Sequence, residues 1–139
     1  MNIDEIKNSL PNGFHDAESL RICIDYAHET ADFLIDFDLS SPDSDMEVSS
    51  RQGLLKLSGL LYCVIEASKS SSSIPEYMPG GDDKLWIASD SSDFGVLTDL
   101  PLLPDPLPEN SFRHWFFITS HNSFIYVAAM NASFEWKDE

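Results

Sequence analysis

Residues 20–39, LRICIDYAHETADFLIDFDL, alternate between apolar and polar side chains on both sides of a short polar interruption. The apolar positions are Leu20, Ile22, Ile24 and Tyr26 in the first run and Ala31, Phe33, Ile35, Phe37 and Leu39 in the second. Because successive side chains of a β-strand point to opposite faces, this period of two predicts two strands with one buried face each. Residues 27–30 supply the turn, so the stretch predicts a β-hairpin.

Further apolar runs follow along the chain. Residues 54–65 are apolar on both faces, which is typical of a strand that is covered on both sides. The other strand candidates are residues 84–89, 94–97, 112–119 and 124–130, with residues 120–123 as the turn of a second hairpin. Residues 3–9 predict a short helix, because Asn2 is a good N-cap and Glu5 follows it three residues later.

Polar stretches separate these runs at residues 40–50, which are acidic, and at residues 68–81, which are rich in Ser, Pro and Gly. Residues 100–109 contain four prolines, which cannot pair as a central strand and predict an extended crossover. We therefore expect a single domain, residues 1–139, that is mainly β: an antiparallel β-sandwich of six to seven strands with a short N-terminal helix. An α+β sheet is the alternative.

The charge of the chain restricts its partners. Twenty-four acidic residues against eight basic ones give a net charge of −16. Such a surface repels phosphate backbones and anionic membranes, so we expect neither a nucleic-acid nor a membrane partner. It attracts a basic protein and speeds the encounter with one. The alternative interpretation is that the charge only keeps the protein soluble.

The N-terminus and the cysteines indicate the compartment. The segment MNIDEIKNSL contains acids and no apolar region, so we expect no signal peptide. The sequence contains no run of about 18 apolar residues, so we expect no membrane-spanning helix. Cys23 and Cys63 lie in apolar runs without metal-binding spacing, which predicts buried free thiols in a reducing compartment. We therefore expect a cytoplasmic protein.

Four acids lie on the polar face of the first hairpin, namely Asp25, Asp32, Asp36 and Asp38. They are either a solvated face or a docking surface for a basic partner. Calcium also prefers clustered carboxylates, but the spacing is not that of an EF-hand loop and strand acids point apart. We predict no metal and no cofactor.

His15 and Asp16, within the motif GFHDA, are the second candidate site. A carboxylate beside a histidine fixes the tautomer of a general base, which would make a ligand pocket or a hydrolase-like site here. The structural alternative is a tight turn at Gly13 with Phe14 as a core residue. The chain contains no GxSxG, P-loop or HExxH motif, which argues against an enzyme.

Residues 112–119 are aromatic on both faces and contain His114, which we expect to be half-buried. One face must cover the core. The other face is either covered by the proline-rich crossover or exposed as an interface, since monomers seldom expose large apolar patches.

Several segments resemble a family of small bacterial proteins of about this length: LPNGFHDA, LRICIDY, LLKLSGLLYCVIE, GGDDKLWIASD and FIYVAAMNASFEW. This resemblance brings no catalytic residues with it. In size, acidity and expected compartment the chain is also similar to the acidic immunity proteins that neutralise polymorphic toxins. That similarity implies a non-enzymatic inhibitor of a basic toxin protein. The sequence leaves the oligomeric state open.

Overall fold

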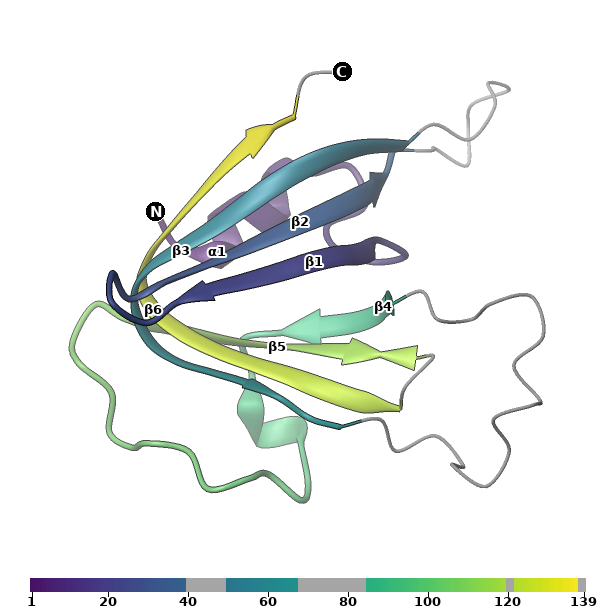
Figure 1. Cartoon of the computed structure of the whole chain (residues 1–139). Helices are drawn as coiled ribbons and strands as arrows, with labels where there is room; N and C mark the ends of the chain where they lie inside the picture. Colours follow the sequence, from purple (N-terminus) through teal and green to yellow (C-terminus); the bar gives the residue numbers. More distant parts are fainter. Residues whose placement is uncertain (40–49, 68–84, 120–121, 138–139) are drawn as a thin grey trace.

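The computed structural model describes residues 1–39, 50–67, 85–119 and 122–137 (Figure 1). In chain order its elements are α1 (Ile3–Ser9), β1 (Glu18–Asp25), β2 (Thr30–Asp38), β3 (Ser50–Ile65), β4 (Leu85–Ser91), the 3₁₀ helix η2 (Phe94–Val96), β5 (Phe112–Ile118) and β6 (Ser123–Trp136). The mainly β prediction is confirmed. Neighbouring strands are antiparallel and hydrogen bond in the ring order β1-β2-β3-β6-β5-β4, with β4 returning to β1.

The long strands β3 and β6 connect two facing groups of strands (Figure 1). In this view β1 and β2 lie in the upper group and β4 and β5 in the lower, while β3 and β6 bend from one group to the other. Gly59 allows the bend in β3, because its φ is +60° and a Cβ atom there would lie only 2.8 Å from the Cβ atom of Met130 on β6. The bend therefore depends on a residue without a side chain.

The helix α1 covers part of β6. Asn2 and Glu5 form the predicted capping box, and the side chains of Ile3 and Ile6 are buried in the core. The backbone N–H of Ala132 donates to the carbonyl of Met1 at 2.7 Å. The strand β5 pairs with β6 only between residues 123 and 129 of β6. The helix α1 lies beside the second half of β6, where β5 no longer pairs with it.

A second apolar cluster lies on the outer face of β5 and β6. Trp115 and Tyr126 are buried there beneath Phe94, and Leu97 and Leu103 pack against them. The second aromatic face predicted from the sequence is thus covered, in part by the proline-rich segment.

The prediction of a strand at residues 94–97 was wrong. This segment is the 3₁₀ helix η2, because the side chain of Asp93 accepts a hydrogen bond from the N–H of Gly95 at 2.9 Å and caps a tight turn. The indole of Trp115 also donates to the carbonyl of Asp93 at 2.9 Å, which holds the turn against β5.

The cysteines are free, but they differ in burial from the prediction. Cys63 is half-buried, and burial raises the pKa of its thiol to about 11. Cys23 is exposed, because it lies on the face of β1 that points away from the core. In the part of the chain that the structure describes, no helix is both long and apolar enough to cross a membrane.

Candidate functional site: an acidic groove between β1, β2 and β4

A groove of about 410 Å³ lies at the corner where β4 returns to β1. The described residues that line it are Asp16, Glu18, Asp36, Phe37, Asp38, Ser50 and Trp86. Four of these seven side chains are carboxylates and none is Lys or Arg. The groove is therefore a strongly negative concave surface.

The turn that precedes β1 brings Asp16 to the groove. Gly13 has a φ of +55° and Asp16 a φ of +64°, and between them Phe14 is wholly buried in the core. The N–H of Asp16 donates to the carbonyl of Ile87 on β4 at 2.9 Å. The structural interpretation of the GFHDA motif is thus confirmed for Gly13 and Phe14, and the same turn places the Asp16 carboxylate at the groove.

A β-bulge brings Glu18 to the groove. Without it, the alternation that places Ile22 and Ile24 against the core would also point Glu18 inward. The register between β1 and β2 shifts between Ser19 and Arg21, so Ser19 is buried and Glu18 faces outward instead. Sequence reasoning missed Glu18 because one extra residue in a strand leaves no mark in the composition.

The register of the sheet places the acids beside one another. Glu18 lies directly opposite Asp36 on β2 and opposite Trp86 on β4. Asp38 follows Asp36 on the same face, with Phe37 pointing into the core between them. Like charges opposite one another destabilise a sheet, so this corner holds repulsion that a bound cation would relieve.

His15 lies beside the groove. Its Nδ1 atom is 3.1 Å from Oδ2 of Asp16, so the turn does bring the two side chains together. Both are 64% exposed, and His15 is not among the described lining residues. A histidine so open to water makes a poor catalytic base, since water competes for each of its hydrogen bonds.

The four acids predicted from the first hairpin do not form one cluster. Asp36 and Asp38 line the groove, whereas Asp25 accepts hydrogen bonds from the N–H of His28 at 3.2 Å and from its Nδ1 at 2.8 Å in the turn after β1. Asp32 lies in mid-strand, opposite Lys56 on β3. The groove thus combines residues of both predicted sites, while Asp25 and Asp32 lie outside it.

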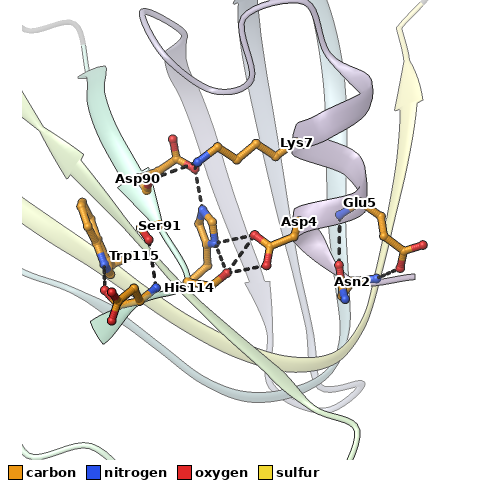
Figure 2. A network of polar contacts seen from close by, with 10 residues as sticks. Asn2, Asp4, Glu5, Lys7, Asp90, Ser91, His114 and Trp115 are labelled. Atoms are coloured by element: carbon orange, nitrogen blue, oxygen red, sulfur yellow. Dashed lines mark hydrogen bonds and ion pairs between the residues drawn. The ribbon is translucent and has the colours of Figure 1, made fainter. Parts of the chain in front are cut away.

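A second polar cluster fastens α1 to β4 and β5 (Figure 2). The Nε2 atom of His114 lies 2.6 Å from Oδ2 of Asp90, and its Nδ1 lies 3.0 Å from Oγ of Ser92. From α1, the Lys7 ammonium lies 3.1 Å from Oδ2 of Asp90, and Asp4 accepts from Ser92 at 2.9 Å. The prediction that His114 is half-buried was wrong, since it is wholly buried.

The cluster contains a serine, a histidine and an aspartate in contact, but its geometry indicates a structural role. The imidazole of His114 has no exposed surface, and the Asp90 side chain is only 4% exposed. The Ser92 hydroxyl is in contact with both carboxylate oxygens of Asp4. Because His114 and Asp90 are buried and the Ser92 hydroxyl is held by Asp4, we assign the cluster to the attachment of α1.

Metal binding has no support among the described residues, where no group of three or more His, Cys, Asp or Glu side chains converges on one point. The groove carboxylates come from the turn before β1, from β1 and from β2, and they are spread along the groove. Their arrangement suits a larger, extended cation.

No protein-family model and no curated protein matches this chain. Among solved structures, it is similar to an uncharacterized protein from Neisseria gonorrhoeae, with a TM-score of 0.45 and 11% sequence identity. The match covers 88% of this chain and 92% of the other.

Proposed function

We propose that this chain is a non-enzymatic binding protein that docks a basic protein by taking an arginine side chain into the acidic groove. The observation that carries the proposal is that four carboxylates and an exposed tryptophan line one groove whose described lining includes no cation. The negative charge of the groove comes from three different segments, through Asp16, Glu18 and Asp36. No single strand therefore supplies all of it.

Arginine fits this groove better than lysine or a metal ion. Its planar guanidinium donates five hydrogen bonds, pairs with two carboxylates at once and stacks on an aromatic ring. Glu18 and Asp36, as opposed residues of an antiparallel pair, have Cβ atoms about 5 Å apart, which suits one guanidinium between them. Trp86 is 40% exposed on the other side of Glu18, which places an aromatic side chain beside the two carboxylates.

The charge outside the groove supports the same partner. With a net charge of −16, the molecule attracts a basic protein over distance, and Asp25 and Asp32 add to that field without contacting the bound arginine. The similarity to acidic immunity proteins supports a toxin as that partner. In this proposal the chain acts in the cytoplasm as an immunity-type inhibitor.

The alternative function is a small-ligand binder or hydrolase-like enzyme at the same place. The contact between His15 and Asp16 at the edge of the groove is the observation that favours it. A small cationic ligand would use the same carboxylates, so the two functions differ in whether a free guanidinium compound binds as tightly as a peptide.

The test compares affinities for a short end-blocked peptide that contains three arginines. The variant Asp16→Asn/Glu18→Gln/Asp36→Asn should bind it at least about tenfold more weakly, because charge-assisted hydrogen bonds are each worth about 1.5–3 kcal/mol. The matched control, Asp99→Asn/Asp105→Asn/Glu109→Gln, removes the same charge from exposed residues far from the groove in sequence. It should retain nearly the wild-type affinity.

Equal weakening in both variants would overturn the proposal, because it would show that only the total charge matters. The same peptide with citrulline in place of arginine should not bind. If methylguanidinium alone binds as tightly as the peptide, the groove is a small-ligand site and the alternative holds.

A further inference from the structure

The outer edge of β1 lacks a strand partner along most of its length. On one edge, β2 pairs with β1 as far as Asp25. On the other edge, β4 pairs only with Glu18 and Ser19 (Figure 1). Within the described part of the chain, no strand pairs with that edge from Leu20 to Asp25. Such an edge presents unpaired N–H and C=O groups and can template another strand.

The side chains along this edge are unusually apolar for an exposed strand. Leu20 is 38% exposed, and Tyr26, directly after the strand, is 83% exposed. Cys23 is exposed, while Ile22 and Ile24 are half-buried. Native edges are commonly protected by lysine, proline or covering segments, and the sequence from Leu20 to Tyr26 contains neither lysine nor proline.

Arg21 is the single basic residue on this edge. It is exposed, and no hydrogen bond or ion pair connects it to any residue that the structure describes. Asp25 lies four residues later on the same face of β1 and bonds to His28. In a molecule with three times as many acids as bases, an exposed arginine without an acidic partner among the described residues is available to an acid of another molecule.

The sequence of β1 is complementary to itself when two copies pair antiparallel about Cys23. Arg21 then lies opposite Asp25 of the partner subunit, twice in each dimer because of the twofold symmetry. Ile22 lies opposite Ile24 of the partner subunit. Leu20 lies opposite Tyr26 of the partner subunit, so the two exposed apolar side chains cover each other.

We propose that the outer edge of β1 pairs antiparallel with the same edge of a second copy of this chain, with Cys23 on the twofold axis. The interface is isologous: it uses one patch twice and closes after two subunits. The bulge between Ser19 and Arg21 ends the pairing before Glu18, so the acidic groove stays open. The dimer therefore does not depend on the function proposed for the groove.

Charge gives this dimer a recognisable salt dependence. Two molecules with a net charge of −16 repel each other, and salt screens exposed charges over about 8 Å at physiological ionic strength. The apolar pairs are insensitive to this screening. Salt should therefore favour the dimer, whereas it should weaken the binding of a basic partner. This difference allows the failure of the dimer proposal to be distinguished from the failure of the proposed function of the groove.

The first test is the mass in solution, measured by sedimentation at several protein and salt concentrations. The wild type should form a dimer whose fraction rises with both. Arg21→Glu and Asp25→Lys should each be monomeric, and the double swap Arg21→Glu/Asp25→Lys should dimerise again. Lys137→Glu changes the charge by the same amount as Arg21→Glu at a distant exposed residue and should dimerise like the wild type.

The second test fixes the register. In a Cys63→Ser background, oxidation by copper phenanthroline should join Cys23 to Cys23 of the partner subunit rapidly. In an Arg21→Cys/Cys23→Ser/Cys63→Ser variant, the two cysteines are displaced by about 13 Å along the strand and should cross-link much more slowly. A wild type that stays monomeric at high salt, a double swap that stays monomeric, or equal cross-linking at positions 21 and 23 would overturn the proposal.

Discussion

The imidazole of His114 is wholly buried between groups from two other segments, and it shows how single residues hold this molecule together. Asp90 accepts from His114 and also contacts the ammonium of Lys7 on α1. A buried charged pair adds little net stability, but removing one member leaves the other without a partner. The sequence could not reveal this cluster, because Lys7 and Asp90 are 83 residues apart and only the closed fold makes them neighbours.

Asp90→Ala should lower the free energy of unfolding by about 3 kcal/mol, since it leaves Nε2 of the buried His114 without its acceptor and leaves the Lys7 ammonium with only the backbone carbonyl of residue 90. Lys7→Met should cost less, about 1 kcal/mol, because Asp90 still accepts a hydrogen bond from His114 and Lys7 is itself 32% exposed. Urea denaturation measures both values. Glu109→Ala, at an exposed residue, serves as the control. An Asp90→Ala protein as stable as this control would show that the cluster does not fasten α1.

Cys63 should give the protein an alkaline dependence of stability. Burial raises the pKa of its thiol from the usual 9.0 to about 11, so the folded state holds the proton more tightly than the unfolded state. The resulting stabilisation is complete below pH 9 and is lost as the pH rises toward 11. Cys63→Ser should therefore lose less stability than the wild type over this window, in denaturation curves at fixed pH. Cys23→Ser should behave as the wild type, and superimposable profiles for all three would contradict the assignment.

At the scale of elements, alternation in the sequence predicted the strands well and their irregularities poorly. The strand β2 follows the period of two, with Phe33 and Ile35 buried as expected, whereas Leu20 and Tyr26, predicted on the buried face of the first strand, are exposed. The bulge before Arg21 and the 3₁₀ turn at Phe94 were missed, because each depends on local backbone geometry rather than on side-chain pattern. The groove was therefore only half predictable: its acids on β2 were named, whereas Glu18 and Trp86 were not.

Gly59→Ala tests the bend in β3. A Cβ atom at Gly59 would lie 2.8 Å from Met130, and a φ of +60° strains any residue with a side chain, so the variant should lose about 3 kcal/mol of stability. Adding Met130→Gly should recover part of this loss, because it removes both the Cβ and the Cγ atoms that clash and leaves the strain. Gly95→Ala, where φ is not in the left-handed region and the nearest atom belongs to the Asp93 side chain, is the control. Thermal denaturation with no difference between Gly59→Ala and Gly95→Ala would contradict this account of the bend.

At the scale of the whole molecule, charge and topology act together. Composition alone predicted an attraction to basic partners, because it needs only the net charge of −16. The composition could not show which part of the surface is both acidic and concave. The ring order brings β4 back to β1, and only this closure sets Trp86 beside Glu18 and Asp36. The long-range field and the local groove thus have different origins in the chain.

The measurement that tests the central claim most directly is a nuclear magnetic resonance titration with the blocked arginine peptide. It follows the side-chain carboxyl carbons of Glu18 and Asp36 and the indole N–H of Trp86. All three signals should move together and saturate with one dissociation constant, while the indoles of Trp115 and Trp136 stay in place. Signals that move linearly without saturation, or that move on other surfaces while these three remain fixed, would contradict the proposal that the groove holds a basic side chain.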